Sequence, residues 1–275
     1  MIKLSGKKIS MYILEIFIIL LSSIIIAPLL IMVFGSFKDS TEAAKAALTL
    51  PIEWKFDNYL FVIKEGGMGR AFINSVLITF FSVFFTVILS SSCGYILSRR
   101  KTRTSRGIYY YIFIGMVAPY QIVTTFILFK ILGISGYASV ITLYVAINLP
   151  FSVILYEGFV KSIPSDIDES AVIDGCGPLR AFTQIIFPLL KPVTVTNIIT
   201  VAMAVWNEFV IPLFLLSSAR HWTLPLTVYN FFGQYSSNWN YVYANLVLTA
   251  LPIVLLYLFL QKYIIAGMTA GAVKS

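Results

Sequence analysis

Apolar residues form six long runs along the chain, and shorter segments rich in charged or turn-forming residues separate them. A helix needs about 20 apolar residues to cross the hydrocarbon core of a bilayer, and each run reaches that length. The pattern therefore predicts six transmembrane helices. Their expected bounds are Tyr12–Phe34, Phe72–Ser98, Ile108–Phe129, Ala138–Phe159, Pro192–Ser217 and Tyr241–Leu260.

The composition points to the same class of protein. Of the 275 residues, 59% are hydrophobic and only 12% are charged, and the mean hydropathy is +0.88. So few charges cannot cover the surface of a soluble domain of this size, whereas a lipid-facing surface needs none. We therefore expect an all-α membrane protein with one transmembrane domain over residues 1–275. The first run stays uncharged from Ile16 to Phe37, too long for a signal-peptide core, so we expect a retained helix.

The charged residues predict the orientation of the chain. With six crossings, three basic groups fall on one side: Lys3, Lys7 and Lys8; Arg99, Arg100, Lys101, Arg103 and Arg106; Lys262 and Lys274. Cytoplasmic loops are enriched in Lys and Arg, so we expect both termini and the loop at residues 99–106 in the cytoplasm. The net charge of +8 is thus a topology signal, and we do not expect nucleic-acid binding.

Residues 38–70 carry charges of both signs and are expected on the outer side. Within them, Trp54, Phe56 and Tyr59 fit either an anchor at the membrane interface or a loop with a few buried aromatic residues. Prolines inside the apolar runs predict kinks, because transmembrane helices tolerate proline where neighbouring groups satisfy the freed carbonyls. These prolines are Pro28, Pro119, Pro150, Pro212 and Pro252.

The segment between the fourth and fifth runs, at about residues 161–191, is longer than a reverse turn requires. Ser165 is a candidate N-cap, with Asp168 three residues later to complete a capping box. The helix that starts there can run to Asp174 and end at Gly175, which accepts left-handed backbone geometry. Pro178 suits the first turn of a second helix. We expect two short cytoplasmic helices joined by a glycine turn.

The same segment carries a spacing that resembles a known motif. Glu169, Ser170 and Ala171 are followed by three residues and Gly175, then by nine residues and Ile-Ile-Phe-Pro, which ends at Pro188. This resembles the EAA loop of binding-protein-dependent ABC importers, in which the pattern is Glu-Ala-Ala, three residues, Gly, nine residues and Ile-x-Leu-Pro. Two positions depart from it, the serine within Glu-Ser-Ala and the phenylalanine before the proline.

The resemblance implies a type I ABC importer permease fold, in which this loop forms a coupling helix that inserts into a groove on the ATPase subunit. A short capped helix transmits a displacement that a flexible loop would absorb. An ordinary amphipathic helix at the interface is the alternative. The residues expected to couple the chain to the ATPase are Glu169, Ser170, Ala171, Asp174, Gly175 and Pro188.

Four further segments are similar to maltose-type sugar permeases, in particular to the smaller six-helix permease: Asn58-Tyr59, Asn74-Ser75, Trp206-Asn207-Glu208-Phe209 and residues 261–274. That resemblance implies import of a carbohydrate, and an oligosaccharide is the first expectation. It implies a second homologous permease, two ATPase subunits that hold ATP and magnesium, and an extracytoplasmic solute-binding protein. The chain has no nucleotide-binding loop, so we expect no enzyme activity and no cofactor of its own, and a place in the cell membrane.

Glu208 is the one acid deep inside an apolar run. A lone carboxylate at the bilayer centre costs about 2.5–3.5 kcal/mol on insertion scales, so it is expected to face a cavity or a partner. Together with Trp206 and Asn207 it suits a pathway for a polar, non-ionic solute. Equally, Asn207 and Glu208 could hold the permease subunits together by hydrogen bonds between helices. Asn148, near Pro150, is a weaker pathway candidate, and Tyr95 is interpreted as a residue of the aromatic belt.

Three other functions compete with this interpretation. An autonomous secondary carrier often shows inverted repeats and several intramembrane charges, whereas this chain has one such acid and no evident repeat. A membrane enzyme would need a nucleophile with a base, or a metal cluster, and neither pattern occurs. The third alternative keeps the importer and changes the cargo to a polyol phosphate, an amino acid or a peptide.

Overall fold

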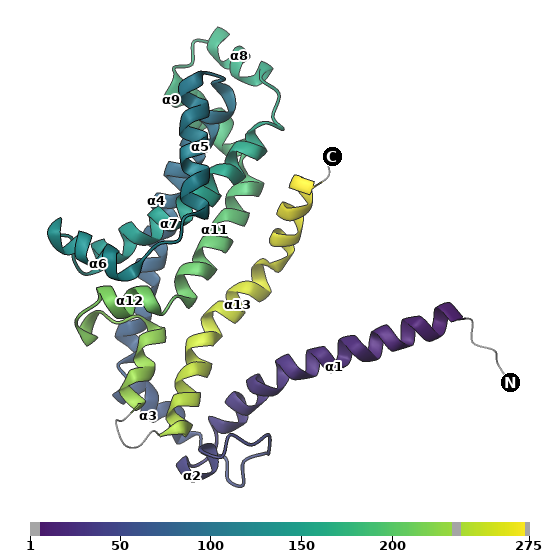
Figure 1. Ribbon diagram of the computed structural model, residues 1–275, viewed down its shortest axis with the longest axis vertical. Helices are drawn as coiled ribbons and strands as arrows, with labels where there is room; N and C mark the ends of the chain where they lie inside the picture. Colours follow the sequence, from purple (N-terminus) through teal and green to yellow (C-terminus); the bar gives the residue numbers. More distant parts are fainter. Residues whose placement is uncertain (1–5, 233–237, 273–275) are drawn as a thin grey trace. The chain divides into compact units, whose positions relative to one another are not determined.

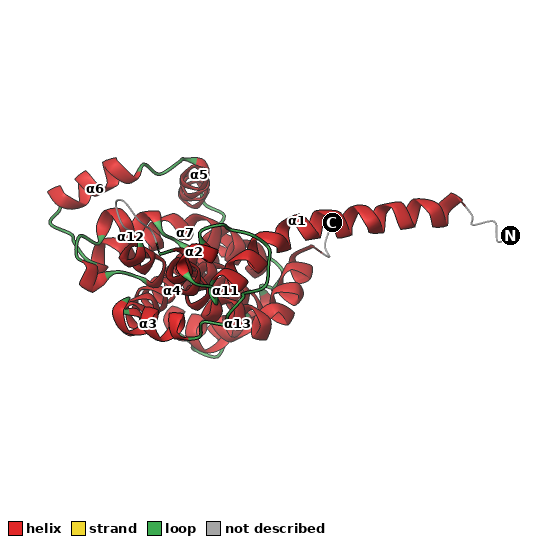
Figure 2. Cartoon of the chain, turned by 90° about the horizontal axis from the view of Figure 1, so that it is seen from below, coloured by secondary structure: helices red, strands yellow, loops and turns green. Residues whose placement is uncertain are grey.

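The computed structural model describes residues 6–232 and 238–272, and the elements of these ranges are helices (Figures 1 and 2). The α-helices are α1 (Gly6–Gly35), α2 (Ser40–Ala43), α3 (Asp57–Glu65), α4 (Met68–Arg99), α5 (Arg103–Val117), α6 (Ile122–Ile131), α7 (Tyr137–Val160), α8 (Asp166–Ile173), α9 (Pro178–Arg180), α10 (Phe187–Leu189), α11 (Lys191–Asn207), α12 (Val210–Leu215) and α13 (Trp239–Ala272). A π-helix, η1 (Ala181–Ile186), and two 3-10 helices, η2 (Ala219–His221) and η3 (Leu224–Phe231), complete the set.

Four of these helices are long and apolar enough to cross a membrane on their own: α1, α4, α7 and α13. Two further pairs pass the same test only when their halves are taken together, α5 with α6 and residues 178–189 with α11. The first pair bends by 120° and the second by 79°. The described ranges therefore hold between four and six candidate membrane spans, and the sequence predicted six.

The prediction of one continuous helix over Ile108–Phe129 is wrong. Helix α5 ends at Val117, and Ala118 is extended, with φ −69° and ψ 122°. Pro119 explains the break, because its ring disfavours helical geometry at the preceding residue and it has no amide N–H to donate. A single helix over Pro192–Ser217 is also wrong, since α11 ends at Asn207 and Glu208 is extended, with ψ 131°.

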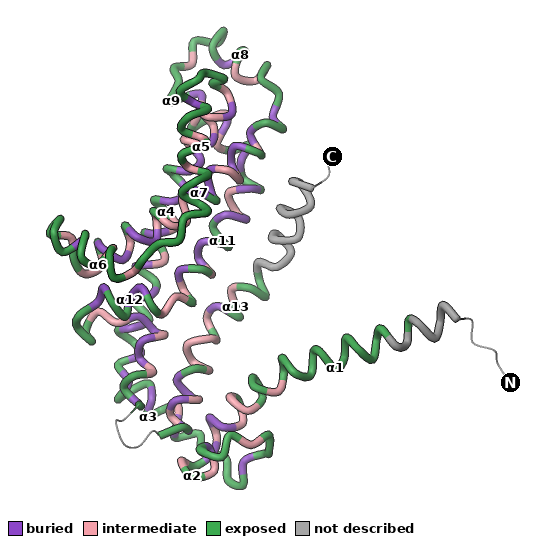
Figure 3. Tube along the Cα trace, in the orientation of Figure 1, coloured by how far each residue is buried: buried purple, intermediate pink, exposed green. Residues whose placement is uncertain are grey.

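The chain divides into two compact units, one of residues 1–69 with 227–251 and the other of residues 70–226 with 252–275. In the second unit, buried apolar side chains of α4, α7 and α11 pack together. Figure 3 shows the buried residues along these helices in purple. Ile78, Val140, Leu143, Val201 and Val205 are members of this core. The loop at residues 161–191 and both helix breaks belong to the same unit as this core.

Helices α4 and α7 also approach closely at a glycine. A Cβ atom on Gly94 would lie 2.7 Å from Tyr156 Cβ and 2.9 Å from the backbone nitrogen of Glu157. Further polar contacts join α7 to α11, with Ser152 Oγ donating to Asn197 Oδ1 at 2.8 Å. Small residues and hydrogen bonds of this kind hold helices together where lipid removes the hydrophobic driving force.

The first unit contains α1, α2, α3 and the beginning of α13. Asn58 Nδ2 donates to the carbonyl oxygens of Ser36 at 2.8 Å and Lys38 at 2.9 Å. Asn240 Nδ2, from α13, donates to Asn58 Oδ1 at 3.0 Å. The span Leu14–Gly35 within α1 has none of its most apolar window buried (Figure 3). A helix that is apolar on all sides and uncovered by its own chain is suited to lipid or to another subunit.

Candidate functional site

The predicted capping box at the start of α8 does not form. Ser165 precedes the helix in helical geometry and makes no side-chain cap. The carboxylate of Asp168 is used by α4 instead. Tyr95 Oη donates to Asp168 Oδ1 at 2.5 Å, and Arg99 Nη2 lies 2.9 Å from Asp168 Oδ2. The prediction failed because a partner distant in the sequence competes with the local backbone for this carboxylate.

We call Tyr95, Arg99 and Asp168 the Asp168 clasp. The Arg99–Asp168 contact is an ion pair whose atoms are not aligned as a hydrogen bond. Arg99 Nη2 also donates to the carbonyl of Ile163 at 3.0 Å. The clasp thus attaches both the approach to α8 and its first turn to the end of α4. Tyr95 has a specific partner here in place of the belt role that the sequence suggested.

The end of α8 follows the prediction. Gly175 has φ +75°, a geometry that side chains with a Cβ rarely adopt. The amide of Cys176 donates to Ala171 O at 2.9 Å, and the amide of Gly175 donates to Val172 O at 3.0 Å. These two bonds form a Schellman motif. Pro178 occupies the first turn of α9, as expected.

The predicted coupling residues do not all share one surface. Glu169, Ser170, Asp174 and Gly175 are exposed, whereas Ala171 is buried and only 3% accessible. Ala171 is therefore not part of the exposed surface of α8. Pro188 is exposed in α10, at the far end of the loop.

Pro188 has a local role that its position explains. Proline cannot donate an amide hydrogen bond inside a helix. The preceding residue, Phe187, closes η1 by donating to the carbonyl of Phe182, five residues earlier. Such π-type bonding is the arrangement found where a helix ladder is interrupted. The proline shapes the path of the chain from α9 into α11.

Sequence reasoning missed the apolar residues of this loop. Val172 is 71% exposed, Ile173 84% and Leu179 77%. Exposed apolar side chains that flank a rigid turn favour a protein partner at this surface. The available signal was the apolar pair Val172-Ile173, which stands directly before the predicted turn at Asp174 and Gly175.

Glu208 lies at the break between α11 and α12. Its Oε1 accepts backbone amides from Phe209 at 3.1 Å, Val210 at 2.8 Å and Ile211 at 3.3 Å. These amides begin α12, where a negative charge is favoured by the unpaired N–H groups and the helix dipole. The carboxylate therefore has an intrachain function as a cap, which neither of the two alternatives drawn from the sequence included.

Trp206, Asn207 and Glu208 are consecutive but do not form one site. Trp206 packs edge-on against Phe72, with ring centroids 6.0 Å apart. It lines an apolar groove of about 660 Å³ between α4, α11 and α13, and neither Asn207 nor Glu208 lines this groove. The Glu208 carboxylate instead accepts the backbone amides of Phe209, Val210 and Ile211.

The two asparagines of the predicted pathway bond to their own helices. Asn207 Nδ2 donates to Met203 O at 2.9 Å from an exposed position. Asn148 is half-buried, and its Nδ2 donates to Tyr144 O at 2.8 Å. Each side chain keeps its carbonyl oxygen as an acceptor. Asn148 lies one helical turn from Tyr144 on α7.

A family model described as "Binding-protein-dependent transport system inner membrane component" matches residues 87–270. That range contains the whole loop at residues 161–191 and both helix breaks.

Three relatives align with this chain over more than nine-tenths of both sequences. The probable starch degradation products transport system permease protein AmyC of Thermoanaerobacterium thermosulfurigenes is 35% identical over 268 residues, which is 96% of this chain and 97% of that protein. The multiple sugar-binding transport system permease protein MsmG of Streptococcus mutans is 34% identical, over 91% of this chain and 92% of that protein. The arabinooligosaccharides transport system permease protein AraQ of Bacillus subtilis is 31% identical, over 95% of each.

A solved structure shares the fold. It is a chain of a bacterial ABC transporter involved in the import of the acidic polysaccharide alginate, with a TM-score of 0.81. The match covers 96% of this chain and 99% of that chain at 20% sequence identity. The likeness therefore shows a common fold over almost the whole of both chains.

Proposed function

Since this chain belongs to the family of binding-protein-dependent transport system inner membrane components, we propose that it is a permease subunit of an ATP-driven ABC importer for a carbohydrate. Oligosaccharides are the expected cargo. Support comes from three relatives whose names refer to starch degradation products, multiple sugars and arabinooligosaccharides, each aligned over at least nine-tenths of this chain.

The proposed assembly contains this chain, a second homologous permease, two ATPase subunits and an extracytoplasmic solute-binding protein. ATP and magnesium belong to the ATPase subunits, and we expect no cofactor on this chain. Both termini and the loops at residues 99–106 and 161–191 are assigned to the cytoplasm. The basic residues support this orientation, and the Asp168 clasp supports a common side for the two loops, because it joins Arg99 to α8.

The structure of α8 and its attachment to α4 are the main support for the coupling role. It is a short helix with a fixed end at Gly175, an exposed surface at Glu169 and Val172, and a charged attachment to α4 through Asp168. A displacement of α8 by an ATPase subunit would pass to α4, and through the packing at Gly94 to α7. Rigid elements in contact are the means by which such a displacement reaches a distant site.

The solute pathway is proposed to pass the polar side chains of Glu208, Asn207 and Asn148, with Trp206 as a flanking aromatic surface. An amide and a carboxylate can accept or donate to hydroxyl groups, which suits a sugar. A phosphate cargo would favour basic groups along the route. Helix α7 contains no Lys or Arg, and Lys191 at its first residue is the one basic residue of α11.

The cargo is tested by purifying the solute-binding protein encoded with this permease and titrating it against sugars, polyol phosphates and amino acids. We expect saturable binding of a carbohydrate and no response to the other classes. Binding of an amino acid or a polyol phosphate with no carbohydrate bound would leave the importer class intact and refute the carbohydrate assignment.

A further inference from the structure

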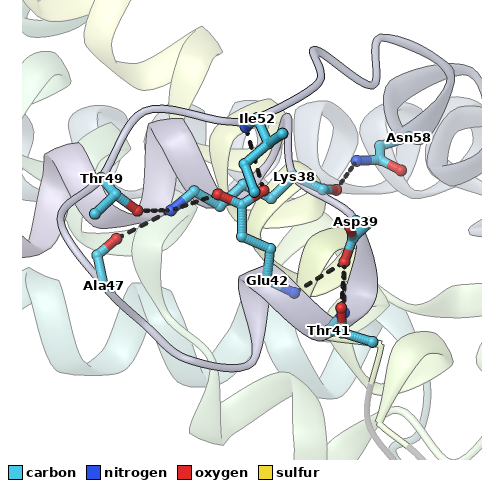
Figure 4. Close-up of polar contacts among 8 residues, drawn as sticks. All are labelled: Lys38, Asp39, Thr41, Glu42, Ala47, Thr49, Ile52 and Asn58. Atoms are coloured by element: carbon cyan, nitrogen blue, oxygen red, sulfur yellow. Dashed lines mark hydrogen bonds and ion pairs between the residues drawn. The ribbon is translucent and has the colours of Figure 1, made fainter.

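A buried lysine organises the loop that follows α1. Lys38 is 1% exposed. Its Nζ donates to Ala47 O at 3.1 Å and to Thr49 Oγ1 at 2.9 Å, and lies 3.6 Å from Glu42 Oε1 (Figure 4). A buried ammonium group is costly unless its protons find acceptors and its charge a partner. The loop supplies two hydrogen-bond acceptors and one carboxylate, so the contacts with Lys38 hold its backbone in place.

The loop is closed at both ends. Asp39 Oδ1 accepts the amides of Thr41 and Glu42 at 2.8 Å each, which caps α2 (Figure 4). The bond from the Glu42 amide is the main cause that holds the pKa of the Asp39 carboxyl below its usual value. On the return, the amide of Lys55 donates to Phe37 O at 2.8 Å. Residues 44–56 therefore leave the end of α1 and come back to it.

The loop presents an apolar side chain at every second position from 48 to 56. The exposed fractions are Leu48 53%, Leu50 65%, Ile52 87%, Trp54 50% and Phe56 64%. We call these five residues the apolar edge. Three of the intervening residues are attached to the chain: Thr49 accepts a hydrogen bond from Lys38, Pro51 is buried, and the amide of Lys55 donates to Phe37 O.

Five large apolar side chains exposed on a fixed loop indicate a surface that contacts a membrane or another protein. The span Leu14–Gly35 ends two residues before Phe37, and its own surface is uncovered by the chain. The rings of Trp54 and Phe56 each lie 5.2 Å from the ring of Phe37. They are therefore held at the level where α1 leaves the hydrocarbon, which is where Trp is enriched in membrane proteins.

From this continuity we propose that the apolar edge inserts into the interfacial region of the bilayer beside α1, and that Lys38 is the residue that holds it in that position. The ligand is the boundary between phospholipid head groups and acyl chains. Trp54 and Phe56 then form an anchor at the membrane interface, which is one of the two alternatives that the sequence left open. This insertion depends on neither the identity of the cargo nor the orientation of the chain.

The test uses the complete transporter in vesicles of phosphatidylethanolamine and phosphatidylglycerol, with Cys93 and Cys176 replaced by serine. An environment-sensitive fluorophore is attached at Ile52→Cys or, as a matched control, at Glu53→Cys. Glu53 is the adjacent residue, and its side chain is 72% exposed. Lipid brominated near the top of its acyl chains should quench the probe at 52 at least twofold more than the probe at 53.

Equal quenching at the two positions would overturn the proposal. So would a probe at 52 that brominated lipid does not reach and that the solute-binding protein shields from aqueous iodide, because the apolar edge would then be a protein-docking surface. Measured transport separates these outcomes from a failure of the importer assignment, which would abolish transport in the unlabelled parent as well.

The role of Lys38 is tested in the Ile52→Cys protein. Lys38→Met keeps most of the side-chain volume and removes the hydrogen bonds to Ala47 and Thr49, so lipid quenching at position 52 should fall at least twofold. Lys45→Met, an exposed lysine of the same loop, should leave it unchanged. Unchanged quenching with Lys38→Met would refute the anchoring role, and if that variant fails to accumulate the comparison of positions 52 and 53 still decides the membrane contact.

Discussion

The coupling mechanism can be tested by one substitution in the Asp168 clasp, Asp168→Asn, which replaces one carboxylate oxygen by an amide nitrogen. Asp168→Asn keeps the size of the side chain and removes its charge. The bond from Tyr95 then loses its ionic acceptor, and the ion pair with Arg99 is lost. We expect α8 to detach from α4 more often while the transmembrane helices stay folded, because the cores of α4, α7 and α11 do not include Asp168.

The magnitude follows from how accessible the clasp is. Hydrogen bonds to charged groups are worth about 1.5–3 kcal/mol, whereas fully exposed ion pairs contribute about 0–1 kcal/mol. The side chains of Arg99 and Asp168 are each 20% exposed, so we place the loss between these limits, at about 1–3 kcal/mol. A coupling free energy of that size corresponds to roughly a 5- to 150-fold change in equilibrium.

The assay is ATP hydrolysis by the reconstituted transporter, with and without the loaded solute-binding protein. Asp168→Asn should keep basal hydrolysis and lower the ratio of stimulated to basal activity. Asp166→Asn is the matched control, because it removes the same charge from an exposed side chain of the same helical turn. Tyr95→Phe should lower the ratio less, and the double variant with Asp168→Asn should resemble Asp168→Asn alone. A wild-type ratio in Asp168→Asn, or an equal fall in Asp166→Asn, would refute the clasp.

Three further substitutions have matched controls or graded outcomes. Gly175→Val places a β-branched residue at φ +75°, which costs about 1–2 kcal/mol, so uptake should be lost with the subunit still in the membrane. Gly177→Val, at φ −65°, should transport normally. Gly94→Ala brings a Cβ to 2.7 Å from α7 and should lower the melting temperature in detergent, as overpacking costs about 1–3 kcal/mol; Gly107→Ala, with open space around it, should not. Glu208→Ala removes the cap of α12, worth about 0.5–2 kcal/mol, and should speed amide exchange over residues 209–211 more than Glu208→Gln does.

Hydropathy predicted the uninterrupted spans closely. The expected Phe72–Ser98 and Ala138–Phe159 correspond to Met68–Arg99 and Tyr137–Val160. These helices have apolar runs with polar or glycine boundaries, which the sequence displays directly. Proline alone did not predict where a helix breaks, since Pro150 lies inside α7. Whether neighbouring groups satisfy the carbonyl freed by a proline depends on packing that hydropathy does not contain.

The loop at residues 161–191 also shows which features have local causes and which have distant ones. The turn at Gly175 depends on backbone geometry within a few residues, and the sequence predicted it. The capping box failed because Asp168 bonds to Tyr95, which is 73 residues away in the chain. The proposed site at Trp206 and Glu208 assumed a continuous helix, and the break between them directs the two side chains to different surroundings.

Uptake of a radiolabelled oligosaccharide by proteoliposomes tests the central claim, that this chain is the permease of an ATP-driven carbohydrate importer. The vesicles contain this chain, its permease partner and the ATPase subunits, with the solute-binding protein on the side from which solute is taken up. Accumulation should require ATP on the opposite side and should stop when this chain is omitted or carries Gly175→Val. Carbohydrate uptake that needs no ATP, or ATP-driven uptake of an amino acid or a polyol phosphate with no carbohydrate carried, would contradict the account.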